Sequence, residues 1–249
     1  MIFWSLFDSG NGSYSRTLSK HDDVTNFAIG IDREKKNDHF INLDLADYKR
    51  LFGDNTLFDT LDKLPKPDVI LASPPCESWS VASAMDRGNA CWKQETGDSL
   101  FAPQQPLSRF TVRDFKDYEK HNYIPHKAIL TRINGELTVF NTIKIIERYA
   151  LKVFVIENPA YGRIWEYIDK ILGFDIQHEN LTYYNNYDYP IKKPTKFKSN
   201  IDLKLKSEGN IRNEVDFNKT GWGYNERSNI PEQLVDYMIN TIIKHLEEE

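Results

Sequence analysis

Two short segments contain side chains that could take part in covalent chemistry. Residues 73–76 read Ser-Pro-Pro-Cys, and the thiolate of Cys76 would be a nucleophile. Residues 157–159 read Glu-Asn-Pro, and a carboxyl group such as that of Glu157 can stay partly protonated in a cleft. In that state it donates a hydrogen bond or a proton to a substrate. Together the segments point to nucleophilic attack assisted by an acid.

Each segment stands where a buried strand should end. The apolar run Val69–Ala72 precedes the cysteine segment, and the apolar run 153–156 precedes the glutamate segment. In an open sheet, reactive groups gather at the carboxyl ends of parallel strands, so Cys76 and Glu157 are expected at one edge. Each also has an ordinary alternative. A lone cysteine is often a small buried apolar residue, and Glu157 could be a solvated side chain in a turn before proline.

The first 31 residues are typical of the start of a nucleotide-binding sheet. A strand over 2–7 leads into a glycine-rich turn over 8–13, a short polar helix and a second strand over 27–31. Asp32 follows that strand, twenty residues after Gly12, where an acid can bind both ribose hydroxyls; a surface charge cluster with Arg33 is the alternative. Asp44 could bind an adenine amino group or cap a turn.

Composition sets bounds on the class of protein. The 249 residues are enough for one large α/β domain, and 40% hydrophobic with 28% charged residues indicates a globular protein. Two cysteines are too few for a disulfide framework, no Cys/His spacing suits zinc, and no metal is expected. Without a signal pattern or a membrane-length apolar run, the cytoplasm is the expected location.

The net charge of −5 argues against coating nucleic acid through bulk positive charge. Six lysines between 192 and 206 could still line a local basic cleft, or form a solvated loop.

The remaining segments predict a single domain over 1–249. Residues 80–135 form a long insertion of weak periodicity, and such connections are uncommon unless they are functional. Helices are expected over 137–149, 165–172 and 231–248, and an antiparallel strand pair is expected to begin at 174–184.

Taken in order, the Gly-x-Gly turn, Asp32, Asp44, Pro-Pro-Cys76 and Glu157-Asn-Pro resemble the motifs of S-adenosylmethionine-dependent DNA cytosine-5 methyltransferases, especially small, phage-encoded members. The resemblance implies a Rossmann-like class I methyltransferase fold, an α/β fold with a mostly parallel, doubly wound sheet and an antiparallel strand near the C-terminal end. It also implies that Cys76 attacks C6 of a flipped cytosine, while Glu157 binds the ring N3 and the exocyclic amine.

The resemblance assigns further residues to the site. The catalytic set would be Cys76, Glu157, Pro75 and Asn158. The S-adenosylmethionine site would comprise Phe7, Asp8, Gly10, Asn11, Gly12, Ser13, Asp32, Arg33, Asp44, Leu45, Ser73 and Pro74.

The chain departs from the family in two places. The usual Gln-x-Arg-x-Arg segment is replaced by residues 189–196, whose lysines keep positive charge but lose the bidentate fork of arginine. The large target-recognition region is nearly absent, so the 80–135 insertion is expected to contact double-stranded DNA. The candidate DNA-binding residues are Ser78, Ser80, Arg87, Arg109, Arg113, Lys192, Lys193, Thr195 and Lys196.

Three alternatives stay open. Ser-Pro-Pro also resembles the motif of cytosine-N4 and adenine-N6 methyltransferases, in which the next residue is aromatic, whereas here it is Cys76. The substrate could be RNA, because neither motif reports the sugar. The chain could instead be a catalytically silent nucleic-acid-binding protein of the same fold. A partner restriction nuclease is neither indicated nor excluded.

Overall fold

A sheet of seven strands forms the centre of the part of the chain that the structure describes. The structure is a computed structural model, and it describes residues 1–31, 39–80, 92–93, 111–112, 125–149, 152–211 and 229–248. The strands lie in the order β3-β2-β1-β4-β7-β9-β8. Their bounds are β1 Ile2–Leu6, β2 Thr25–Gly30, β3 Phe40–Asn42, β4 Val69–Ala72, β7 Val153–Pro159, β8 His178–Tyr183 and β9 Pro194–Ser199.

Strand direction confirms the predicted fold class. Strands β3, β2, β1, β4 and β7 pair in parallel, and β9 runs antiparallel to both β7 and β8. The fold is therefore a doubly wound, Rossmann-like α/β sheet with its antiparallel strand near the C-terminal end. In the sheet, β2 and β3 lie on one side of β1, whereas β4 and then β7 lie on its other side. A topological switch point therefore lies between β1 and β4.

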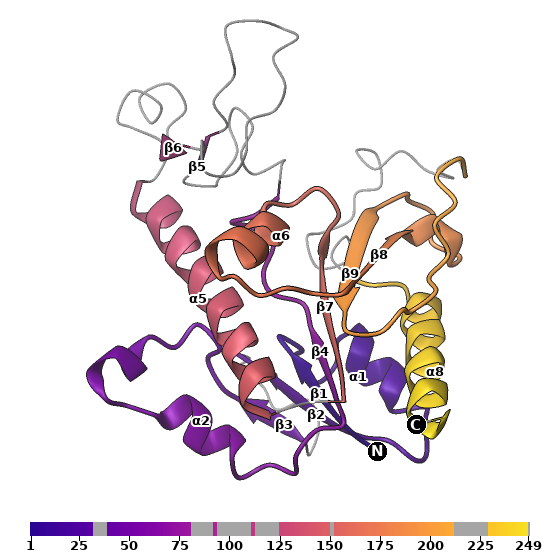
Figure 1. Ribbon diagram of the computed structural model, residues 1–249, viewed down its shortest axis with the longest axis horizontal. Coiled ribbons are helices and arrows are strands. Elements are labelled where there is room, and N and C mark those ends of the chain that lie inside the picture. Colours follow the sequence, from indigo (N-terminus) through magenta and orange to yellow (C-terminus); the bar gives the residue numbers. More distant parts are fainter. Residues whose placement is uncertain are drawn as a thin grey trace, which may run out of the picture.

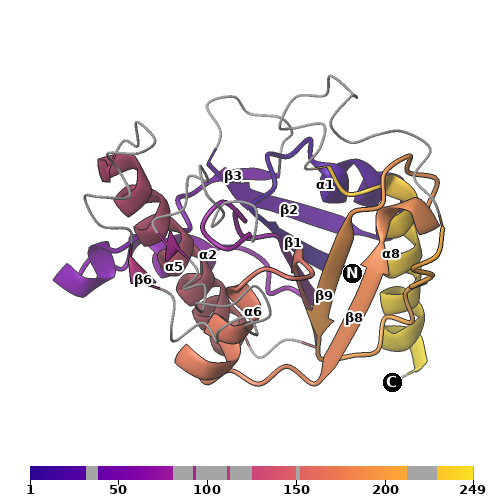
Figure 2. The same cartoon turned by 90° about the horizontal axis from the view of Figure 1, so that it is seen from above.

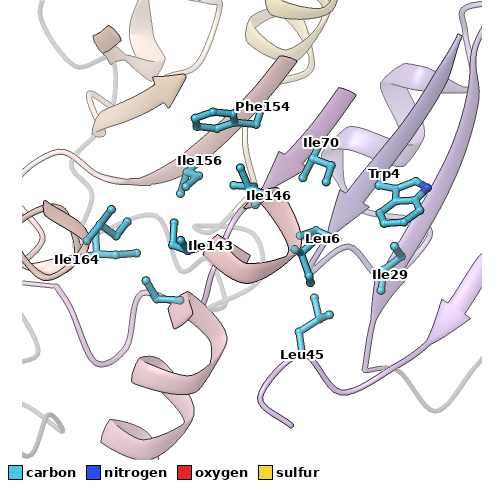
Figure 3. Close-up of a cluster of buried hydrophobic side chains, with 14 of the residues drawn as sticks. Trp4, Leu6, Ile29, Leu45, Ile70, Ile143, Ile146, Phe154, Ile156 and Ile164 are labelled. Carbon is cyan, nitrogen blue, oxygen red and sulfur yellow. The ribbon is translucent and has the colours of Figure 1, made fainter. Parts of the chain in front are cut away.

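Helices cover both faces of the sheet, which explains why β4 and β7 are continuous apolar runs (Figures 1 and 2). On one face α2 (Thr56–Leu61), α5 (Pro125–Tyr149) and α6 (Ile164–Glu166) build a core (Figure 3). On the other face α1 (Ser13–Leu18) and α8 (Glu232–Glu248) build a second core. The short elements are η1 (Lys49–Phe52), the π-helical turn η3 (Tyr167–Ile171), η4 (Tyr184–Asn186) and the pair β5 (Trp92–Lys93) and β6 (Thr111–Val112).

The first and last helices are joined by ion pairs. Glu232, the first residue of α8, accepts from Arg16 at 2.9 Å and from Lys20 at 2.7 Å. Ser13, at the start of α1, accepts a hydrogen bond at 3.1 Å from the backbone N of Ile230. The turn that precedes α1 is therefore supported by the segment that enters α8.

Some helices differ from those expected. The helix expected over 137–149 begins at Pro125, so its first turns belong to the predicted insertion. Ile129 and Leu130 are 51% and 62% exposed there, and these outward apolar residues obscure the helical spacing. The helix expected over 165–172 is divided into α6 and η3, whereas α8 follows Pro231 as predicted. None of the helices in the described ranges has the length and apolar character needed to span a membrane.

Candidate active site

The turn after β1 is folded around the carboxylate of Asp8. This side chain is 5% exposed, and it accepts from the backbone N of Gly10 at 2.7 Å and of Gly12 at 3.1 Å. Ser15 adds its backbone N at 3.2 Å and its hydroxyl at 2.9 Å. A Cβ on Gly12 would lie 2.7 Å from the carboxylate, and Gly10 has a φ of +79°, so both positions favour glycine. Asp8 therefore holds the turn from within.

Replacing Asp8 by alanine is expected to lower the free energy of unfolding by about 2–4 kcal/mol, because buried backbone N–H groups lose a charged acceptor. Urea unfolding measures the loss. Ser9→Ala is the matched control, since its hydroxyl is an exposed acceptor in the same turn. Equal urea midpoints for Asp8→Ala and Ser9→Ala would contradict this role of Asp8.

A hydrogen bond joins the two sides of the switch point. Tyr14, from α1, is 3% exposed, and its hydroxyl lies 2.9 Å from that of Ser73, which directly follows β4. Leu6 of β1 pairs with Ala72 of β4, so the turn after β1 and the segment after β4 begin side by side. Ligands of doubly wound sheets bind in this crevice.

The turn that carries Cys76 is anchored on several sides. The carbonyl of Cys76 accepts from the backbone N of Trp79 at 3.0 Å and of Ser80 at 2.9 Å, and Cys76 itself is half-buried. Trp79 is fully buried and packs on Tyr167, with ring centroids 4.8 Å apart. The hydroxyl of Ser78 donates to the carbonyl of Thr131 in α5 at 2.8 Å, so this predicted DNA ligand is used within the protein. The thiol is thus carried by a rigid turn.

Gly135 of α5 allows this turn to dock. A Cβ at that position would lie 2.5 Å from Cβ of Ser78, so no side chain fits. In an open helix Gly→Ala stabilises by about 0.5–1 kcal/mol, but here Gly135→Ala is expected to destabilise by about 1–3 kcal/mol through overpacking. Thermal or urea unfolding measures the sign. The double variant Gly135→Ala/Ser78→Gly should recover part of the loss, and a stabilised Gly135→Ala protein would show that the contact is not tight.

Glu157 and Cys76 approach from neighbouring strands. Ala72 of β4 pairs with Ile156 of β7, so Glu157 stands next to Ser73, three residues before the cysteine. The amide of Asn158 donates to the carbonyl of Pro74 at 2.8 Å and ties the two segments together. Glu157 is only 7% exposed. Burial raises the pKa of Glu157, while the charge of Lys193 and the neighbouring hydroxyls of Ser73 and Tyr184 act to lower it.

The lysine-rich segment between β8 and β9 is largely engaged with its own neighbours. Lys193 lies 4.9 Å from the ring centre of Tyr184, and Lys192 lies 4.5 Å from that of Tyr183. Lys196, on β9, forms an ion pair with Glu179 of β8 at 2.6 Å. Thr195 is fully buried. Of these predicted DNA ligands, Lys193 is the one whose charge acts on Glu157.

The other predicted site residues have mixed positions. Phe7 has a left-handed φ of +65° at the end of β1, and Leu45 is buried in the core. Asp44 accepts a hydrogen bond from the N of Ala46 at 2.8 Å, which closes a local turn. Ser80 directly follows the anchored turn of Cys76. Asp32, Arg33, Arg87, Arg109 and Arg113 lie outside the described residues.

Sequence reasoning missed two tyrosines of the site. Tyr14 and Tyr184 are both buried, and the charge of Glu157 contributes to the raised pKa of each, after burial itself. The signal for Tyr14 was its place in the first turn after Gly12. Tyr184 lies in a run of aromatic and polar residues, and nothing in that pattern indicates which ring faces the site.

Comparisons with known proteins gave matches in structure. No protein-family model matches the chain. No curated protein matches it. Its structure is similar to that of a protein named as a DNA modification methyltransferase encoded within a prophage (E. coli), with a TM-score of 0.40, 14% identity and coverage of 80% of this chain. It is also similar to the Dnmt2 methyltransferase of S. pombe (TM-score 0.43, 14% identity, 81% coverage). A third is the Entamoeba histolytica methyltransferase EhMeth (TM-score 0.38, 13% identity, 83% coverage).

The matched regions span 46%, 50% and 55% of those three structures, so this chain corresponds to about half of their length. Identities and TM-scores this low do not identify an activity.

Proposed function

We propose that the protein is a DNA methyltransferase that transfers a methyl group from S-adenosylmethionine to C5 of cytosine. One observation carries the proposal. Cys76 and Glu157 follow adjacent parallel strands beside the switch point, and Asn158 ties their segments together through the carbonyl of Pro74. A nucleophile and a buried acid at one edge of the sheet suit attack on a single heteroaromatic ring.

Cytosine explains why both groups are needed. Its C5 is a poor nucleophile until a thiolate adds at C6, and attack by Cys76 forms the S–C6 bond and moves the C5–C6 π electrons to C5. Burial raises the pKa of Glu157 and so favours its protonated form, which would donate to N3 and relieve the charge that develops in the ring. C5 would then take the methyl group that the cofactor supplies, and the cofactor would leave as its thioether, S-adenosylhomocysteine. Loss of the C5 proton to water and breakage of the S–C6 bond would then restore the aromatic ring and the free thiolate.

The described residues fit S-adenosylmethionine at the crevice beside β1. The turn held by Asp8 presents its backbone there, since Gly10 and Gly12 carry no side chain, and Asp44 follows β3 at the same edge of the sheet. When bound, the cofactor supplies the electrophilic methyl group. Ser13 and Ser73 would border it, together with Asp32 for the ribose hydroxyls.

The substrate base must leave its stack to reach Cys76, because the thiol lies on a half-buried turn. We therefore propose a cytosine flipped out of double-stranded DNA. Lys193, whose charge acts on Glu157, would meet the phosphate or base near that residue, and Ser80 follows the turn of Cys76. The further candidates for DNA contact are Arg87, Arg109, Arg113, Lys192 and Lys196.

Mass spectrometry of nucleosides tests the proposal. Double-stranded DNA is incubated with the purified protein and methyl-labelled S-adenosylmethionine, and RNA is run in parallel. Label on C5 of cytosine in DNA is the expected result. Label on N4 of cytosine or N6 of adenine would replace the proposal with an amino-methyltransferase. Label only on RNA would overturn the DNA assignment, and absence of label from both would contradict the proposed activity.

A further inference from the structure

Glu157 is buried beside groups that favour its charged form. Burial raises its pKa, whereas Lys193, Ser73 and Tyr184 each act to lower it. Burial thus favours the neutral acid, but the neighbouring groups suit the carboxylate. Such an environment is expected for a group that starts neutral and becomes charged during a reaction.

The hydroxyl of Tyr184 has an unusual position. The side chain is fully buried, and within the described residues this oxygen has no hydrogen bond of good geometry. Its polar neighbours include Glu157 and Thr195. Burying a hydroxyl without a partner is costly, and such a group in a folded protein calls for an explanation. Packing does not explain the presence of the hydroxyl, because phenylalanine would fill the same core and lie equally well beneath Lys193.

Ser73 is a second donor toward the same carboxyl. Its hydroxyl lies 2.9 Å from that of Tyr14, whose ring is buried in α1. A hydrogen bond given by Tyr14 to Ser73 leaves the proton of Ser73 for Glu157. Two hydroxyls from different elements therefore act on the pKa of Glu157, that of Ser73 after β4 and that of Tyr184 in η4.

We propose that Tyr184, assisted by Ser73, is a positioning residue that stabilises the anion of Glu157 during the reaction. This inference rests on the function proposed above. As the S–C6 bond forms, electron density moves through the ring to N3, which takes the proton of Glu157 and leaves a carboxylate. The hydroxyl of Tyr184 then gains a charged acceptor, so its hydrogen bond is strongest when the adduct forms. When the S–C6 bond breaks, N3 returns the proton to Glu157.

The charged and titratable groups around Glu157 determine in which direction Tyr184→Phe shifts the pKa of Glu157. Lys193, between β8 and β9, favours the Glu157 anion. Tyr14 from α1 and Tyr184 from η4 face Glu157, Asp8 acts on Tyr14, and Tyr189 acts on Tyr184. Tyr184→Phe removes a donor to the anion and keeps the others, so it should move the titration of Glu157 to higher pH.

Carbon-13 NMR of the free protein, labelled at the glutamate carboxyl carbons, measures this titration without cofactor or DNA. The Glu157 signal is assigned from its loss in Glu157→Gln. The titration midpoint is expected at higher pH in Tyr184→Phe and in Ser73→Ala than in the wild type. Tyr187→Phe is the matched control: it removes a buried phenol hydroxyl of the same region, which accepts from the N of Lys206 at 2.8 Å.

An unchanged or lower midpoint in a folded Tyr184→Phe protein would overturn the proposal. If that variant does not fold, an unchanged midpoint in Ser73→Ala would overturn it equally. In the methylation assay, Tyr184→Phe should lower kcat roughly tenfold with little change in KM, and the pH–rate profile should move upward with the NMR midpoint. A shifted midpoint in a protein that methylates nothing would refute the proposed function and leave the donor role of Tyr184 intact.

Discussion

Replacing Cys76 by serine is expected to abolish methyl transfer to C5, lowering the rate by at least about three orders of magnitude. A serine hydroxyl ionises far above neutral pH, whereas a cysteine thiol ionises much closer to it, so serine is the much weaker nucleophile. The substitution changes little in volume at a half-buried position, and the anchors of the turn are backbone and neighbouring side-chain groups. Folding and uptake of S-adenosylmethionine should therefore persist, as circular dichroism and calorimetry would show.

The second cysteine of the chain provides the matched control. Cys91→Ser should methylate C5 at the wild-type rate, because the proposed chemistry uses only Cys76. Label on C5 that survives in Cys76→Ser would exclude a covalent mechanism through this thiol. Partial activity on an amino group in both serine variants would instead favour an amino-methyltransferase.

Replacing Glu157 by glutamine is expected to reduce the methylation rate by roughly 10²- to 10⁴-fold, the usual contribution of a positioned acid. Glutamine has a similar shape and can donate a hydrogen bond to N3, but it cannot transfer a proton. Binding of DNA should change little, so the loss should appear in kcat rather than in KM. A variant with wild-type kcat would show that Glu157 has no acid role.

The same variant should change the pH dependence of stability. The folded pKa of Glu157 lies above its ordinary value of 4.5, so the folded state holds this proton more tightly than the unfolded state does. The free energy of unfolding of the wild type should therefore fall as pH rises from about 4.5 through the folded pKa. Glu157→Gln should lack this component of the decrease, as urea titrations at several pH values would measure.

Asp68, which directly precedes the neighbouring strand β4, should give stability the opposite dependence on pH. Partial burial acts to raise its pKa, but hydrogen bonds from the N of Ile2 and from Lys152 lower it overall. Its contribution to stability is present above the ordinary value and is lost as pH falls through the lowered pKa. Asp68→Asn should remove that acid-side dependence without impairing methylation.

For Glu157→Gln, a free energy of unfolding with the same pH dependence as the wild type would contradict the raised pKa of Glu157.

The fold could be predicted where local pattern and global position agree. The runs that became β4 and β7 are apolar throughout because both faces are covered, and each ends in polar residues. Parallel pairing of adjacent strands then suffices to place Cys76 near Glu157. Much of the candidate site follows from that one step.

The remainder depends on contacts between distant segments, which local pattern does not contain. Gly135 has the appearance of a weak point in a helix, yet it is the position that admits the turn of Ser78. Lys196 was expected to face DNA, and its pairing with Glu179 depends on the register of β8 against β9. The hydroxyl of Tyr184 acts on the pKa of Glu157 although η4 lies 27 residues further along the chain.

The ion pairs between the first and last helices impose an order on how the site is completed. Strand β1 and the turn around Asp8 are synthesised long before Glu232, the residue whose carboxylate pairs with Arg16 and Lys20. The hydroxyl of Ser13 likewise cannot accept its hydrogen bond from the backbone N of Ile230 until that residue has been synthesised. At about 5–20 residues per second, more than ten seconds separate the synthesis of Arg16 from that of Glu232. The nascent chain should therefore acquire the supported turn around Asp8 only after residues 230–232 have emerged.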